Sequence, residues 1–205
     1  MIIIYDHEYQ AYNLTELDKF LVSDDIINWQ HPDILELAQQ LGQGKDHHQI
    51  ALHCFNYVRD KIRHSGDYKL NPVTCIASDV LKHRTGYCYA KSHLLAALLR
   101  ANGIATGLCY QRLTISNEQA PFCLHGLNAV YLPGTGWYRM DARGNKPGVN
   151  AQFTPPVEQL AFQIVSKGEI DLPGIYAKPH SEVLTALNTY TDIIELGTNL
   201  PDIVT

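Results

Sequence analysis

Cys88 occupies the position in this sequence that best suits a reactive thiol. It follows the turn signal Gly86-Tyr87 and opens a run of strong helix formers whose leucines repeat at helical spacing, namely Leu94, Leu95, Leu98 and Leu99. The first turn of a helix has free backbone N–H groups and the positive end of the helix dipole, and both favour a negative charge. Because the thiolate is the reactive form of cysteine, this position predicts a nucleophile. Taken alone, Cys88 also fits a small buried hydrophobic residue.

His125 and Asp141 are the residues that would complete such a site. A cysteine nucleophile needs a base within hydrogen-bond reach, and the base needs an orienting partner. Both residues lie on predicted neighbouring strands that follow the cysteine helix. Each has a structural interpretation by itself, but the order Cys, His, Asp across one helix and two strands favours a catalytic set.

The remaining cysteines and histidines show no metal or disulfide pattern. The sequence has 5 cysteines and 10 histidines but no C-x-x-C and no H-E-x-x-H. An odd cysteine count without such pairs argues against a disulfide framework and against a structural zinc site. We therefore expect no metal or organic cofactor. Four cysteines are expected to be structural or incidental: Cys54, Cys75, Cys109 and Cys123.

Composition indicates a soluble globular protein. Of the 205 residues, 45% are hydrophobic and 18% are charged, which is typical of one domain with a substantial core. The net charge of −5 argues against nucleic acid and anionic membranes as partners. No run approaches the ~20 apolar residues of a membrane span. Ile2-Ile3-Ile4 is too short for a signal sequence, so a cytoplasmic location with reduced thiols is expected.

The first half of the chain is predicted to be helical. Helical spacing or capping signals predict helices at 15–21, 32–42, 46–62, 74–83 and 88–101. Asp46 and Gln49 form a predicted capping box, and Gly103 suits a left-handed C-terminal cap. Ile26, Ile27 and Trp29 are expected to dock the N-terminal arm on the core. Residues 64–68 are predicted to be a polar loop, which suits either a cleft wall or an ordinary connector.

The second half changes to a strand pattern. Strands are predicted at 104–113, 124–132 and 137–141, with loops at 116–121 and 143–150. A short helical turn is predicted at 157–162, and a last helix is expected to be capped by Ser181 and to extend through Ile194. Helices followed by an antiparallel sheet indicate an α+β fold. We predict a single domain over 1–205, with a core at 46–145, an arm at 1–45 and an extension at 146–205.

The connection between the last two strands decides whether His125 and Asp141 can meet. Side chains alternate between the faces of a strand, so a one-residue slip moves a whole set to the other face. A two-residue loop at 134–135 would place the two residues on opposite faces. A three-residue loop at 133–135 pairs Leu132 with Gly136 and puts them on one face. We predict a three- or five-residue connection, or a bulge that restores this parity, with Gly134 or Gly136 at positive φ.

Three motifs in order carry a family resemblance. G-Y-C-Y-A-K (86–91), H-G-L-N-A-V-Y-L (125–132) and G-W-Y-R-M-D-A-R-G (136–144) resemble the transglutaminase-like superfamily of papain-like thiol enzymes, over about residues 46–145. The flanking segments look like those of small bacterial transglutaminase-like cysteine peptidases. The resemblance implies a papain-like core and acyl transfer on an amide, with Cys88, His125 and Asp141 as the catalytic triad.

The implied reaction proceeds through a thioester. His125 takes the Cys88 proton, Asp141 holds the imidazole tautomer, and the thiolate attacks a peptide or protein amide. The Cys88 N–H should donate to the oxyanion, while the second donor is left among Tyr87, His64 and Gln111.

Two departures from animal transglutaminases favour hydrolysis as the outcome. Tyr89 stands where they usually have tryptophan, and the chain has no room for their flanking β domains and calcium sites. A peptidase or amidase is therefore expected. Protein-glutamine transglutaminase activity, a peptide-glycan amidase and a non-catalytic binding module remain as alternatives, although an intact Cys/His/Asp set argues against the last. The sequence does not determine the oligomeric state.

Overall fold

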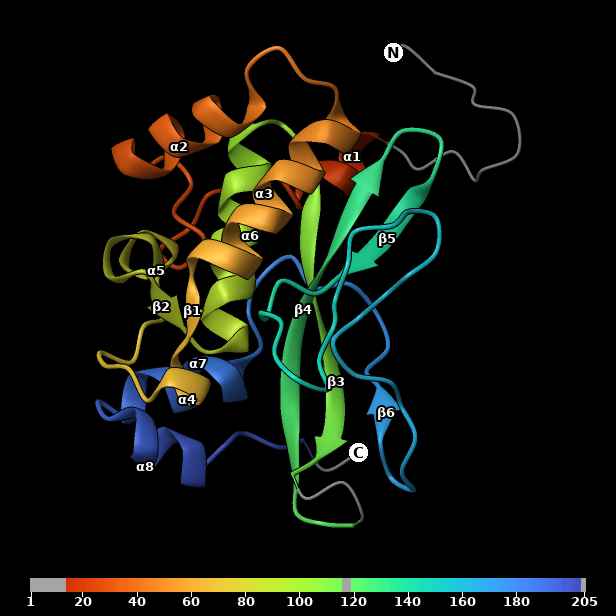
Figure 1. Cartoon of the computed structure of the whole chain (residues 1–205). Helices are drawn as coiled ribbons and strands as arrows, with labels where there is room; N and C mark the ends of the chain where they lie inside the picture. The colour runs from red at the N-terminus through yellow and green to blue at the C-terminus, as the bar shows by residue number, and fades with distance from the viewer. Residues whose placement is uncertain (1–13, 116–118, 204–205) are drawn as a thin grey trace.

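The computed structural model describes residues 14–115 and 119–203, and it has the predicted α+β architecture (Figure 1). Ile2-Ile3-Ile4 and part of the predicted loop at 116–121 lie outside the described residues. The helices are α1 Leu14–Asp18, α2 Pro32–Gly42, α3 His47–Lys61, α4 Ser65–Tyr68, α5 Ala77–His83, α6 Cys88–Ala101, α7 Ser181–Thr189 and α8 Ile193–Thr198.

A four-stranded antiparallel sheet forms the second layer, with strand order β5-β4-β3-β6. Its strands are β3 Thr106–Thr114, β4 Phe122–Leu132, β5 Gly136–Met140 and β6 Ile170–Asp171. The three strands predicted from the sequence are present, with ends shifted by one or two residues. A separate parallel pair joins β1 Arg63–His64 to β2 Thr85–Gly86. β1, β2 and β6 were not predicted, because a strand of two residues carries no alternation pattern.

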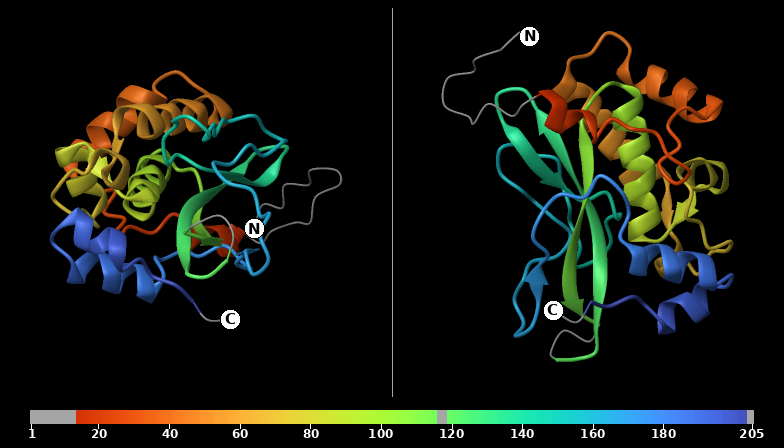
Figure 2. Two further views of the ribbon diagram at one scale, coloured as in Figure 1. Left: turned by 60° about the horizontal axis from the view of Figure 1, so that its bottom comes forward. Right: turned by 180° about the vertical axis from the view of Figure 1, so that it is seen from behind.

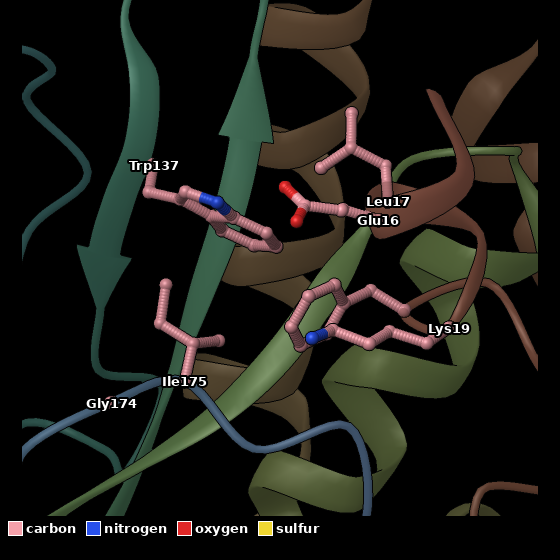
Figure 3. A pocket seen from close by; sticks show the side chains of 7 residues that line it. Glu16, Leu17, Lys19, Trp137, Gly174 and Ile175 are labelled. Atoms are coloured by element: carbon pink, nitrogen blue, oxygen red, sulfur yellow. The ribbon is translucent and has the colours of Figure 1, made fainter. Parts of the chain in front are cut away.

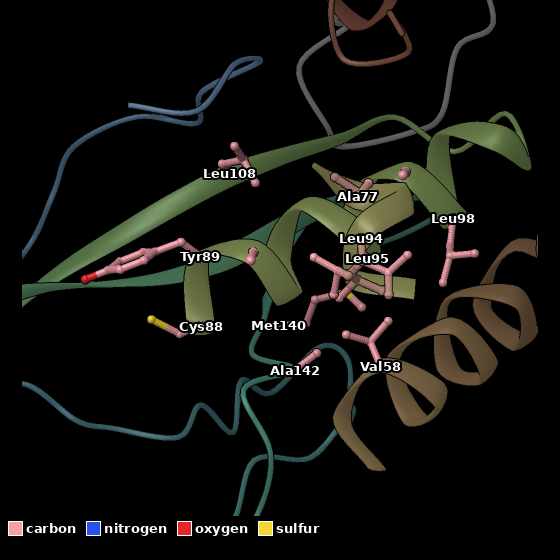
Figure 4. Close-up of a cluster of buried hydrophobic side chains, with 14 of the residues drawn as sticks. Val58, Ala77, Cys88, Tyr89, Leu94, Leu95, Leu98, Leu108, Met140 and Ala142 are labelled. Carbon is pink, nitrogen blue, oxygen red and sulfur yellow. The ribbon is translucent and has the colours of Figure 1, made fainter. Parts of the chain in front are cut away.

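Helix α6 forms the centre of the molecule, between the other helices of the first layer and the sheet (Figures 1 and 4). Every residue from Cys88 to Arg100 is buried, so the helix is enclosed on all sides rather than along one stripe. Two of its buried polar side chains contact backbone carbonyls elsewhere in the chain. Lys91 donates to Ile62 O, and His93 Nδ1 lies 2.8 Å from Cys75 O. Gly103 follows the helix at φ 72°, as predicted.

The other N-terminal helices largely follow their sequence signals. The capping box of Asp46 and Gln49 is complete, with both reciprocal hydrogen bonds present. Pro32 begins α2, as its predicted range requires, although Leu35 of this helix is 40% exposed. The N-terminal arm docks through Ile27, which is fully buried, and through Trp29 Nε1, which donates to Leu21 O.

Four local predictions were wrong. Residues 65–68 form the short helix α4 instead of a loop, because the ring of His64 caps it by accepting from Asp67 N–H. Thr74 stays extended ahead of α5, since its hydroxyl donates to Thr85 O. No helical turn forms at 157–162.

The C-terminal helix is the fourth correction. It is two helices, with His180 rather than Ser181 capping α7 and Asp192 capping α8. Both helices lie at the end of the helical layer that contains α4 (Figures 1 and 2). Asn71 ties α8 to that end of the molecule, because its amide donates to Asp192 and its carbonyl oxygen accepts from Ile193 N–H.

The hairpin between β4 and β5 has the predicted register. Leu132 pairs with Gly136 and Asn128 with Met140, so a three-residue loop joins the strands. Gly134 and Gly136 have φ values of 74° and 77°, conformations that glycine adopts without steric cost. This register places His125 and Asp141 on the same face of the sheet.

Candidate active site

Cys88 is the first residue of α6, and one residue separates it from β2 (Figure 4). Tyr87 precedes it as the N-cap residue without a side-chain cap hydrogen bond. Gly86 belongs to β2 and its φ is not positive, so its role differs from that of a turn glycine. A Cβ at Gly86 would lie 3.2 Å from the Ala90 Cβ and from the Thr74 hydroxyl, so the missing side chain permits close packing behind the cysteine.

A second glycine brings the start of α6 against β4. A Cβ at Gly126 would lie 2.9 Å from Tyr89 Cδ1 and 3.1 Å from Tyr89 Cα. Only glycine allows the first helical turn to approach the strand this closely. Because Gly126 follows His125 and Tyr89 follows Cys88, this contact brings the thiol and the imidazole to one place.

His125 and Asp141 are joined by a short hydrogen bond, 2.7 Å between Nε2 and Oδ2. Asp141 is fully buried and its carboxylate has two further donors, the N–H of Arg143 at 3.0 Å and the N–H of Ala161 at 3.1 Å. Burial alone raises the pKa of Asp141, but the charge of His125 and these hydrogen bonds outweigh it and lower the pKa. The carboxylate is therefore ionised and its orientation is fixed.

The imidazole of His125 is held in its protonated form. Burial lowers its pKa, but the charges of Asp141 and Cys88 and hydrogen bonds to both raise the pKa to about 10. Since Nε2 is bonded to Asp141, Nδ1 is the nitrogen available to the Cys88 sulfur. The arrangement suits a thiolate beside an imidazolium.

These residues line one cavity of about 830 Å³. Cys88, His125, His64, Tyr87 and Arg143 contribute to its wall. The rest of the lining combines apolar and polar side chains. The apolar ones include Leu113, Ile115, Leu124, Leu160, Phe162, Val165 and Leu200, and the polar ones are Thr114, Asn150, Gln159, Gln163 and Glu169. A volume of this size is typical of small-molecule and peptide sites.

The segment predicted as a helical turn is instead irregular, and its residues 159–162 line the cavity. Ala161 donates to Asp141, and the edge of Phe162 packs on His125 with ring centroids 5.0 Å apart. Side-chain spacing in the sequence could not reveal this role, because the donor is a backbone N–H.

An ion-pair cluster borders the cavity next to these residues. Arg143 binds both oxygens of Asp67, at 2.7 and 2.9 Å, and Lys146 binds one of them at 2.6 Å. Burial alone raises the pKa of Asp67. The hydrogen bonds from Arg143 and Lys146 outweigh burial and hold this pKa well below its usual range. Sequence analysis missed this cluster, whose members are 76 and 79 residues apart.

Comparison with known proteins identifies the family. The profile of the transglutaminase-like superfamily matches residues 35–142, more than half of the chain. The chain belongs to this superfamily. The match begins earlier than the resemblance noted from the motifs and ends near the same point. No curated protein matches the chain in a sequence comparison.

A solved structure shares the fold of this transglutaminase-like chain. A proposed cysteine protease from Cytophaga hutchinsonii is 22% identical with a TM-score of 0.52, over 62% of this chain and 42% of that one. The periplasmic domain of TgpA from Pseudomonas aeruginosa is 19% identical with a TM-score of 0.48, over 64% and 48%. The chain thus aligns with less than half of either structure. None of the described helices is long and apolar enough to cross a bilayer.

The other four cysteines of this superfamily member are held as thiols. Cys54, Cys75 and Cys109 are buried, which raises their pKa values to about 12, 11 and 12. Cys123 is half-buried and lines the cavity of Cys88, and its pKa is raised to about 12 by burial and by the charge of Cys88. The sequence could have predicted that Cys123 lies near His125, because residues two apart on a strand share one face of the sheet.

A smaller hollow of about 300 Å³ lies between α1 and β5 (Figure 3). Its lining consists of Glu16, Leu17, Lys19, Phe20, Trp137, Gly174 and Ile175. It contains no cysteine or histidine, so the chemistry expected from the sequence belongs to the larger cavity.

Proposed function

We propose that this transglutaminase-like protein is a cysteine-dependent acyl-transfer enzyme that hydrolyses amide bonds in peptides or proteins. Cys88 is the nucleophile, His125 the base and Asp141 the residue that orients the base. The observation that carries the proposal is the 2.7 Å bond from His125 to a buried carboxylate, in the cavity that holds Cys88 at a helix start. The Cytophaga hutchinsonii structure, described as a proposed cysteine protease, agrees with this reaction class.

The reaction follows from the charges. The Cys88 sulfur attacks the amide carbonyl carbon while the carbonyl electron pair moves onto oxygen. The Cys88 N–H at the helix start donates to this oxyanion. His125 then gives its proton to the leaving amine, and a thioester with Cys88 remains. Water deprotonated by His125 hydrolyses the thioester, and Asp141 stabilises the imidazolium at each stage.

The compartment proposed for this enzyme is the cytoplasm. All five cysteines are free thiols, which fits a reducing environment. Cell fractionation with thiol trapping tests this, and finding the protein outside the cytoplasm would contradict it.

Substitution of the two reacting residues tests the proposed function. Cys88→Ala and His125→Ala should each abolish turnover of any amide selected from a peptide and acyl-amide library. Because triad members act as a unit, the double variant should be little worse than either single variant. Circular dichroism checks that the fold is retained. Unchanged turnover by Cys88→Ala would refute the assignment, and product found only with an added amine would make the enzyme a transglutaminase.

A further inference from the structure

The proposed reaction requires a second donor to the oxyanion, in addition to the Cys88 N–H. We infer that the imidazole of His64 is this donor, acting through its Nε2–H. The inference rests on the proposed acyl transfer at Cys88. Three candidates were open from the sequence: Tyr87, His64 and Gln111.

The position of His64 places it beside the nucleophile. The parallel pairing of β1 with β2 sets the backbone of His64 next to Gly86, two residues before Cys88. The side chain lines the same cavity as Cys88 and His125 although it is only 5% exposed. Its ring packs on Tyr87 with centroids 4.7 Å apart, which restricts its orientation.

The hydrogen bonds of His64 determine which nitrogen carries the proton. Nδ1 accepts from the backbone N–H of Asp67 at 3.3 Å, so this nitrogen presents a lone pair. The Asp67 carboxylate is 3.6 Å from Nδ1, and both of its oxygens already accept from Arg143. A neutral ring with Nδ1 as acceptor carries its hydrogen on Nε2. Nε2 has no hydrogen-bond partner within 14–115 and 119–203, which leaves it free for a substrate.

The charge state agrees with this tautomer. Burial, followed by the positive charge of Arg143, holds the pKa of His64 well below its ordinary value despite the opposing charge of Asp67. His64 is therefore neutral near neutral pH. A neutral, fixed N–H is suited to an oxyanion, because the donor is already oriented when charge develops on the substrate oxygen.

The competing groups are less suitable. The Gln111 amide donates to Asp171 at 3.1 Å and to Phe162 O at 3.5 Å, and the residue does not line the cavity. The terminal nitrogens of Arg143 are bonded to Asp67. The Tyr87 hydroxyl has no hydrogen bond among the described residues, so nothing fixes the direction of its proton.

Two reactions of the same thiol separate oxyanion stabilisation from nucleophilicity. Acylation of Cys88 by p-nitrophenyl acetate forms a sulfur–carbon bond, passes through an oxyanion and releases p-nitrophenolate. Alkylation by iodoacetamide displaces iodide and forms no oxyanion. His64→Leu should slow acylation by about 10²-fold, as is typical when one oxyanion donor is lost, and leave alkylation unchanged. His64→Gln, which retains an N–H donor, should recover part of the acylation rate.

The controls keep the outcomes distinct. His53→Leu makes the same change on the exposed face of α3 and should alter neither rate. Unchanged acylation in His64→Leu, or equal slowing of both reactions, would overturn the inference; equal slowing would make the role of His64 structural. A selective acylation loss in Tyr87→Phe with none in His64→Leu would assign the donor to Tyr87 instead. If wild type and Cys88→Ala are acylated at the same rate, the proposed function itself fails.

Discussion

At the scale of residues, the site depends on how charge is distributed among groups removed from water. Asp141 has three hydrogen-bond donors for its two oxygens, and this allows a carboxylate to remain ionised without exposure. Its charge, together with that of Cys88, in turn stabilises the imidazolium of His125. The thiol, the imidazole and the carboxylate therefore depend on one another electrostatically, and each substitution should change the titration of its neighbours.

Thiol mapping is the first test at this scale. Limiting iodoacetamide near neutral pH should label Cys88 before the other four cysteines. Burial raises the pKa values of those thiols to about 11 or 12, so almost none of each is thiolate at that pH. Peptide mass spectrometry gives the order of labelling. Faster labelling of Cys123, which shares the cavity, would count against the model of the site.

The titration of His125 is the second test. Its imidazolium should persist to about pH 10, and Asp141→Asn should lower that pKa because the neighbouring negative charge is lost. Since the folded pKa exceeds the unfolded value of ~6.5, the stability contributed by His125 is complete below that pH and is lost as pH rises toward the folded pKa. Nuclear magnetic resonance of labelled histidines measures this pKa in the wild type and in Asp141→Asn. The His125→Ala variant identifies the signal of His125. Titration of His125 near its ordinary value in the wild type would contradict this account.

At the scale of elements, close approach between α6 and β4 sets the position of the nucleophile. The helix begins at Cys88, and the strand carries His125 next to a glycine that leaves room for Tyr89. The register of the β4–β5 hairpin then brings Asp141 to the same face. One helix start, one glycine contact and one loop length together assemble three side chains from separate elements.

Gly126→Ala tests the helix–strand contact. The added methyl group would lie 2.9 Å from Tyr89 Cδ1 and 3.1 Å from Tyr89 Cα, so the Tyr89 ring and the first turn of α6 must shift. We expect destabilisation of about 1–3 kcal/mol, as for other overpacked sites, and a larger loss of Cys88 acylation than the folded fraction explains. Urea denaturation and p-nitrophenyl acetate kinetics measure the two effects.

Gly197→Ala is the matched control, since a Cβ at Gly197 of α8 meets nothing within 4 Å. It should be neutral or stabilising, because alanine favours a helix over glycine. Equal behaviour of the two alanine variants would show that the glycine contact does not position Cys88.

At the scale of the whole molecule, buried polar side chains of α6 connect segments that are distant in the sequence. Arg100 is 2% exposed and donates to Thr106 O at 3.0 Å, to Val22 O at 2.8 Å and to Ala177 O at 2.8 Å. It therefore joins the N-terminal arm, the start of β3 and the segment before α7. Lys91 similarly holds the end of α3 near the site through Arg59 O and Ile62 O.

Arg100→Met tests this connection. The variant keeps much of the side-chain volume but leaves three carbonyl groups without their donor, so we expect a loss of about 3 kcal/mol in the free energy of unfolding. Arg139→Met is the control, because Arg139 forms ion pairs at a side chain that is 31% exposed and should cost under ~1 kcal/mol. Urea denaturation compares them, and similar losses would show that Arg100 does not connect the segments.

Local sequence patterns predict the helical first half, the three main strands, the hairpin parity and the residues expected to react. These features depend on local rules: helical spacing after Cys88, strand alternation around His125 and the length of the loop before Asp141. Each rule needs only neighbouring residues, so a single sequence suffices to apply it.

The contacts that complete the site form only in the folded molecule. The N–H of Ala161, the ion pair of Asp67 with Arg143 and the free nitrogen of His64 come from segments that no local pattern relates to Cys88. The same holds for the enclosure of α6 on all sides and for the two-residue strands β1 and β2. These contacts arise when distant segments pack together, because a buried polar group is stabilised by a hydrogen-bond partner and the fold supplies that partner from whichever segment lies next to it.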